Sequence, residues 1–143
     1  MSVVGWKVGG EEYLPELAAT EQTYQIPQDL LARIAFQESS WRNAVIDYAI
    51  ESPAGAIGIM QLIPRFFPGV GMGWESDIEI AAQELVRLFL HYNDWQKAVA
   101  AYDWGEGNVD KWNGQFAALP TETQNYVTDV FTDVPVQGAI INV

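Results

Sequence analysis

The sequence of 143 residues has no cysteine, a single histidine and few basic residues, and each shortage excludes a class of chemistry. Without cysteine, disulfides, thiolate metal sites and thiol nucleophiles are excluded. With His91 as the one histidine, a metal site built from several histidines is excluded as well. We therefore expect neither a metal ion nor another cofactor.

The charge is strongly acidic, because seven Lys and Arg residues stand against nineteen Asp and Glu residues and give a net charge of -12. Polyanions repel such a chain, so we expect no nucleic-acid partner. No run of about eighteen apolar residues occurs, so we expect no membrane-spanning helix. The first residues lack the basic start and long apolar stretch of a secretory signal, which predicts that no export signal is encoded.

Hydrophobic residues make up 49% of the sequence and recur at helical spacing through most of it. This amount of apolar side chain suffices for one core, and the spacing favours a mainly α-helical single domain over residues 1–143. We expect helices that begin at Pro15, Pro27, Ser76, Asp94 and Thr121, and the first two are expected to run to about Tyr24 and about Trp41.

The ends of these helices are predicted from local capping patterns. Ser76 with Glu79, and Thr121 with Gln124, have the spacing of capping boxes, and Gly105 is expected to end the helix that starts at Asp94.

Irregular segments are expected between the helices. Residues 42–56 contain Pro and Gly, a short apolar helix follows up to Pro64, and residues 67–74 form a glycine-rich loop. The apolar tail after Val134 has no helical period and is expected to be a docking strand.

One carboxyl group lies on the apolar face of the predicted second helix. Leu31, Ile34 and Glu38 are spaced by three and four residues, which places them on one helical face, and Trp41 continues it. Apolar surroundings raise the pKa of a carboxyl, as a general acid working near neutral pH requires. The alternative is that Glu38 only borders the face and points to solvent or to Arg42.

Four segments resemble, in the same order, the motifs of the soluble lytic transglycosylase catalytic domain. They are 38–41 (ESSW), 52–64 (SPAGAIGIMQLIP), 98–109 (AVAAYDWGEGNV) and 122–127 (ETQNYV). The resemblance spans roughly residues 27 to 131. It implies a goose-type-lysozyme-like helical fold, with a groove that binds the alternating N-acetylglucosamine and N-acetylmuramic acid of peptidoglycan.

The resemblance also implies a mechanism, in which the glutamate of the ES motif protonates the glycosidic oxygen. The same residue then takes the proton of the muramoyl 6-hydroxyl, and the product is a 1,6-anhydro sugar. This role falls on Glu38.

The family pattern assigns contacts with the substrate to further residues: Ser52, Gly58, Met60, Gln61, Tyr102, Asp103 and Tyr126. Trp41 and Trp104 are expected as platforms for sugar rings. All of these except Gln61 have a structural alternative: a turn for Ser52, a helix start for Gly58, a solvated acid for Asp103, and core packing for Met60, the tyrosines and the tryptophans.

Two departures from the pattern leave a second reaction open. Asp103 replaces the usual asparagine, and a longer segment after Trp41 adds Asp47 and Glu51. A second carboxylate that activates a water would make the enzyme a muramidase, which hydrolyses the same bond. A further alternative, of another class, is a glycan-binding or structural module without catalysis.

The acidic charge disfavours free diffusion onto an anionic cell wall. We therefore expect delivery to the periplasmic peptidoglycan by a larger machine, such as a bacteriophage virion, whose proteins would be partners. A secretion-system accessory enzyme and a holin-released lysis enzyme are the alternatives.

Overall fold

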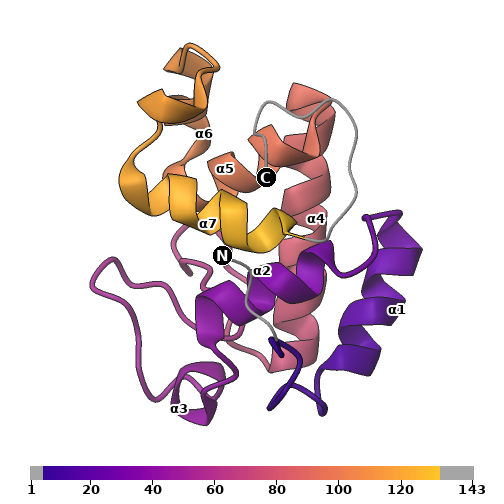
Figure 1. Ribbon diagram of the computed structural model, residues 1–143. Helices are drawn as coiled ribbons and strands as arrows, with labels where there is room; N and C mark the ends of the chain where they lie inside the picture. The colour runs from indigo at the N-terminus through magenta and orange to yellow at the C-terminus, as the bar shows by residue number, and fades with distance from the viewer. Residues whose placement is uncertain (1–4, 133–143) are drawn as a thin grey trace. The chain divides into compact units, whose positions relative to one another are not determined.

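The computed structural model describes residues 5–132, which form seven α-helices, one short 3-10 helix and no strand (Figure 1). The prediction of a mainly helical chain is confirmed. The tail after Val134, expected as a docking strand, lies outside the described residues. No helix within residues 5–132 is both long and apolar enough to cross a membrane.

Two compact units divide the described chain between Gln83 and Glu84, inside α4 (Trp74–Tyr92). The first contains α1 (Leu14–Tyr24), α2 (Leu30–Ser39) and α3 (Asn43–Ile46). In it α2 packs against α1 (Figure 1). Its largest fully buried side chains are Leu17, Leu30, Leu31, Ile34, Ile46, Ile59, Met60 and Ile78. Each such side chain contributes about 1.5–3 kcal/mol to folding.

The second unit contains the end of α4, followed by α5 (Trp95–Trp104), α6 (Glu106–Lys111), the 3-10 helix Phe116–Ala118 and α7 (Thr121–Phe131). Both α6 and α7 pack against α5 (Figure 1). Side chains buried in this unit include Leu85, Leu88, Val99, Val127, Val130 and Phe131. The prediction of one domain over residues 1–143 stays a prediction.

Several helix ends lie where the sequence predicts them. α1 has Pro15 in its first turn and ends at Tyr24. The Asp94 side chain accepts a hydrogen bond of 2.9 Å from the backbone N–H of Lys97 and so caps α5. Gly105 ends α5 with a φ of 102°, which is a conformation that favours glycine.

Both predicted capping boxes are wrong. α4 begins at Trp74 rather than at Ser76, because the carbonyl of Gly73 already accepts a helical hydrogen bond from the N–H of Asp77. At α7, Pro120 occupies the capping position. The amide of Gln124 donates instead to the carbonyl of Leu119, at 2.9 Å.

The second helix is shorter than predicted at both ends. It begins at Leu30, three residues after Pro27, and it ends at Ser39. Ser40 and Trp41 have positive φ values of 50° and 56°, so they leave the helix in the left-handed region.

Candidate active site

Glu38 lies in the last turn of α2, at the border between core and surface. Leu31 and Ile34, on the same helical face, are fully buried, and Glu38 is half-buried. Directly after it the Ser39 hydroxyl donates to the carbonyl of Ala35 at 2.8 Å and accepts the N–H of Trp41 at 3.1 Å. The helix therefore ends in a fixed geometry beside the carboxyl.

A buried carboxylate from α1 fixes the other end of α2. Glu21 is 2% exposed, and its two oxygens accept the N–H groups of Asp29 at 2.9 Å and Ala32 at 3.0 Å. Burial raises the pKa of Glu21, while these backbone donors act in the opposite direction. Glu21 satisfies N–H groups that the start of a helix leaves without partners. No sequence pattern connects Glu21 with α2, because it lies on a different helix.

Trp41 does not form the sugar platform that the sequence suggested. Trp41 is 7% exposed, and its ring stacks on Tyr13 with ring centroids 5.8 Å apart. Its indole N–H donates to the carbonyl of Trp6 at 2.7 Å. Gly10 lies so close to the ring that a Cβ there would collide with it. The side chain is part of the core, because the helix ends before Trp41 and the chain turns inward.

Ser52 closes a short turn after the segment that contains α3. Its hydroxyl oxygen accepts the N–H of Ala56 at 2.9 Å, and its own N–H donates to the carbonyl of Ala56 at 2.9 Å. The hydroxyl is thus used as an acceptor there, and its proton can still be donated to a ligand. Asp47 and Glu51, the added acids of this segment, are exposed.

The short apolar helix expected before Pro64 is absent, and a tight turn occupies its place. An isolated antiparallel bridge joins Ile57 and Leu62, with hydrogen bonds of 3.0 and 3.2 Å. Gly58 and Gln61 have positive φ values of 82° and 51°, whereas residues of a right-handed helix have negative φ. The amide group of Gln61 donates to the carbonyl of Gly58 at 3.0 Å, so the side chain folds over its own turn.

Two expectations for this turn change with it. Gly58 does not start a helix. Glycine is required at this position because its φ is positive and because Asp77 and Tyr48 pack closely against it. Met60 is fully buried, as core packing predicts, while Gln61 remains half-buried.

The other predicted substrate contacts lie in the second unit. Tyr102 and Asp103 are half-buried on α5, and Tyr126 is 8% exposed on α7, which packs against α5. Asp103 accepts a hydrogen bond of 2.9 Å from the hydroxyl of Thr123 and so joins the two helices. Burial raises the pKa of Asp103, against the effect of this hydrogen bond. Trp104 is half-buried at the end of α5.

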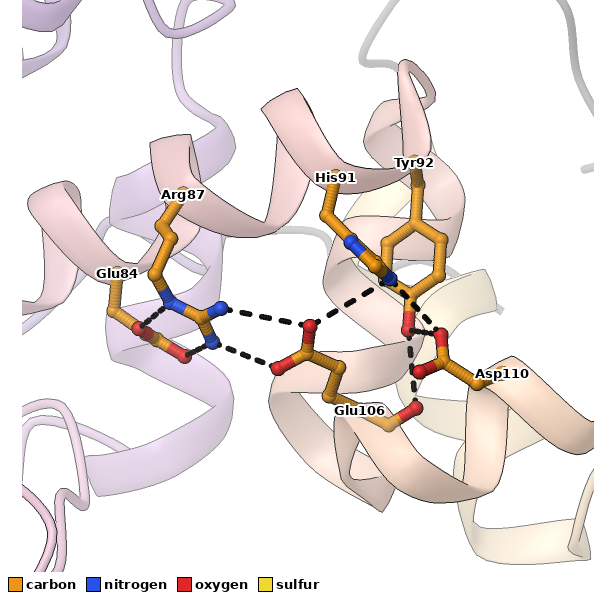
Figure 2. A network of polar contacts seen from close by, with 6 residues as sticks. All are labelled: Glu84, Arg87, His91, Tyr92, Glu106 and Asp110. Atoms are coloured by element: carbon orange, nitrogen blue, oxygen red, sulfur yellow. Dashed lines mark hydrogen bonds and ion pairs between the residues drawn. The ribbon is translucent and has the colours of Figure 1, made fainter.

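A second polar cluster of this unit joins α4 to α6 (Figure 2). The ring Nε2 of His91 lies 3.1 Å from Asp110 and 3.6 Å from Glu106. These three side chains are close enough to share a metal ion. Arg87 already pairs with Glu106 at 3.0 Å, and the hydroxyl of Tyr92 donates to Asp110 at 2.8 Å, so an ion would compete with both.

The predicted site residues thus form two sets, each placed within its own unit. Glu38, Ser52, Gly58, Met60 and Gln61 belong to residues 5–83, and Tyr102, Asp103 and Tyr126 to residues 84–132. The first set offers one half-buried carboxyl, Glu38, with a hydroxyl and an amide group, and the second set offers a further half-buried carboxyl, Asp103, with two tyrosines. Such groups suit acid and base catalysis on a neutral polar ligand.

Comparison with known proteins gives concordant matches. Residues 16–125 match the model of a family described as the transglycosylase SLT domain. The soluble lytic murein transglycosylase of Escherichia coli strain K12 is 31% identical, with 74% of this chain and 20% of that protein covered. The protein of the same name from Salmonella typhimurium is also 31% identical, with 73% and 20% covered. The chain spans about a fifth of the length of these curated relatives.

Proposed function

The chain belongs to the transglycosylase SLT domain family, and we propose that it is a lytic transglycosylase of peptidoglycan. The bond cleaved is the β-1,4 bond between N-acetylmuramic acid and N-acetylglucosamine. The observation that carries the proposal is the family match over residues 16–125, which includes Glu38 in the last turn of α2. The relatives named soluble lytic murein transglycosylase support the same substrate.

Glu38 is the catalytic acid and base in this proposal. It gives its proton to the glycosidic oxygen while the bond from that oxygen to C1 of the muramoyl sugar breaks. The muramoyl 6-hydroxyl then bonds to C1 and returns its proton to Glu38, so no water is consumed. Glu38 is half-buried at the end of α2, so its carboxyl is held by the helix and can still reach a ligand for both steps.

The substrate contacts predicted from the family pattern are part of the proposal. Gln61 offers an amide whose orientation is set by the carbonyl of Gly58, and Ser52 keeps a hydroxyl proton for donation. Tyr102 and Tyr126 offer aromatic rings and hydroxyls, and Asp103 a carboxylate braced by Thr123. Met60, the turn residue before Gln61, is fully buried and anchors the turn in the core.

The product of digestion tests the reaction directly. We expect mass spectrometry of digested cell walls to show muropeptides that end in 1,6-anhydro-N-acetylmuramic acid. Exclusively reducing ends would overturn the transglycosylase assignment in favour of hydrolysis, with Asp47, Glu51 or Asp103 as the base. Binding to walls without any soluble product would favour a non-catalytic glycan-binding module.

Replacement of Glu38 by Gln removes the transferable proton and keeps the size of the side chain. We expect the rate of anhydro-muropeptide release to fall by about 100-fold or more. Glu79→Gln is the matched control, because Glu79 is exposed on α4 and neither the proposed reaction nor the alternative uses it. Far-UV circular dichroism should be unchanged in both variants. Full activity of the Glu38 variant would refute the assignment of the catalytic residue.

Delivery by a larger machine is the second part of the proposal. The net charge of -12 makes spontaneous accumulation on an anionic wall unfavourable, and a bacteriophage virion would supply a high local concentration instead. The chain would then act on the peptidoglycan of the periplasm, in contact with other virion proteins. Mass spectrometry of purified virions tests this, and absence of the chain from them would overturn it.

A further inference from the structure

A buried aspartate connects three separate segments of the first unit. Asp77, in the first turn of α4, is 0% exposed. Its Oδ2 accepts the hydroxyl of Tyr48 at 2.7 Å, and its Oδ1 accepts the N–H of Gly71 at 3.0 Å. The hydroxyl of Tyr48 in turn accepts the N–H of Gly73 at 2.7 Å. Since a buried polar group without partners is costly, these bonds restrict the three segments to one arrangement.

The turn that carries Gln61 lies directly against this aspartate. Gly58 has a φ of 82°, and a Cβ on it would lie 2.7 Å from Asp77 Oδ2 and 3.2 Å from a ring carbon of Tyr48. Only glycine fits there, and the Gly58 backbone has no room to move toward the aspartate. The carbonyl of the same residue accepts the side chain of Gln61 at 3.0 Å. The orientation of Gln61 therefore depends on the position of Gly58, and that position depends on Asp77 and Tyr48.

We propose that Asp77 and Tyr48 are positioning residues, which hold the Gly58–Gln61 turn in the conformation that presents Gln61 to the glycan. The proposal rests on the proposed function, because it assigns Gln61 a substrate contact. Neither positioning residue takes part in proton transfer. Loosening the turn should therefore weaken substrate binding and leave the chemical step almost unchanged.

Tyr48→Phe is the test, and the second unit provides a closely matched control. Tyr92 also donates its hydroxyl to an aspartate, Asp110, at 2.8 Å, but it lies outside the proposed site. Amide hydrogen exchange at residues 58–62 should become about tenfold faster in Tyr48→Phe and remain unchanged in Tyr92→Phe. Equal exchange at these amides in wild type and Tyr48→Phe would overturn the proposal.

Steady-state kinetics on soluble peptidoglycan glycan chains separates positioning from general destabilisation. We expect KM to rise about fivefold in Tyr48→Phe with kcat within about twofold, and neither to change in Tyr92→Phe. A fall in kcat alone, or equal effects in the two variants, would refute the positioning role. If the wild-type chain cleaved no glycan, the proposed function would fail, and exchange at residues 58–62 would still decide whether Tyr48 holds the turn.

A pair of glycine substitutions tests the contact with Asp77 itself. Gly55 and Gly58 both have positive φ, at 91° and 82°, but nothing lies within 4 Å of a Cβ placed on Gly55. Both alanine variants share the backbone strain, and only Gly58→Ala also collides with the aspartate. We expect Gly58→Ala alone to accelerate exchange at residues 58–62. Similar exchange in the two variants would show that Asp77 does not restrict the turn.

Discussion

Two tyrosine–aspartate pairs, one in each unit, have nearly the same local chemistry and very different surroundings. Tyr48 donates to Asp77 at 2.7 Å and Tyr92 donates to Asp110 at 2.8 Å. In both tyrosines burial is the largest cause of a raised pKa, followed by the hydrogen bond to the aspartate, and the pKa of Tyr48 is raised to about 12. Asp77 is 0% exposed, whereas the side chain of Asp110 is 46% exposed.

The two aspartates differ in what can satisfy a hydrogen-bond donor once its bond to the carboxylate is lost. Around Asp110, water can satisfy any donor whose bond to the carboxylate is lost, because the side chains of Asp110 and of its neighbour His91 are 46% and 45% exposed (Figure 2). Around Asp77, which is 0% exposed, the donors are the Tyr48 hydroxyl and the backbone N–H of Gly71, both on half-buried residues, so water replaces the lost carboxylate less readily. The same pair of residue types therefore stabilises a defined conformation in one unit and a replaceable surface contact in the other.

The largest change in the free energy of unfolding is expected from removal of the buried carboxylate of Asp77. Asp77→Ala leaves the Tyr48 hydroxyl and the Gly71 N–H without their acceptor, and we expect the free energy of unfolding to fall by about 3 kcal/mol. Asp110→Ala should change it little. Urea denaturation of both variants measures the contrast, and Asp77→Asn, which keeps one acceptor oxygen, should fall between wild type and Asp77→Ala. Equal losses at the two aspartates would contradict the comparison.

Residues near one another in sequence were predicted well. The spacing of Leu31, Ile34 and Glu38 placed the carboxyl at the edge of the core, because a helix fixes which residues share a face. Asp94 and Gly105 were predicted as the ends of α5 for the same reason, since capping depends on neighbours within a few residues.

Long-range contacts were not predictable in this way. Tyr48 and Asp77 are 29 residues apart, and the Asp29 and Ala32 N–H groups that Glu21 accepts lie on the following segment, 8 and 11 residues away. No periodic pattern connects such positions. The turn at residues 57–62 was mistaken for a helix because an apolar run of that length fits both structures, and positive φ at Gln61 has no sequence signature.

An intermediate change in the free energy of unfolding is expected at Asp103, which is less buried than Asp77 and less exposed than Asp110. Burial raises its pKa above the ordinary value of 3.8. Protonated Asp103 is therefore favoured in the folded state. Its contribution to the free energy of unfolding is fully present below pH 3.8 and is lost as the pH rises through the folded-state pKa. Asp103→Asn cannot ionise, and its amide oxygen can still accept the hydroxyl of Thr123.

The variant should thus match wild type at about pH 3.5 and be the more stable protein at about pH 7, as measured by urea denaturation at both values. A stability difference that does not grow with pH would show that burial of this carboxylate has no net cost.

The smallest change in the free energy of unfolding is expected for the exposed ion pairs of Arg87. Arg87 bridges Glu84 at 2.8 Å and Glu106 at 3.0 Å, but its side chain is 53% exposed. We expect Arg87→Gln to lower the free energy of unfolding by less than about 1 kcal/mol, because exposed ion pairs gain little over their hydrated charges. Measured again in about 1 M NaCl, the difference from wild type should vanish, since salt screens exposed charges. The loss in Asp77→Ala should persist in the same salt, because Asp77 is fully buried and its partners, a hydroxyl and one backbone N–H, carry no charge for salt to screen. A salt-resistant loss at Arg87 would mean that the α4–α6 cluster behaves as a buried network and that exposure does not separate the two regions.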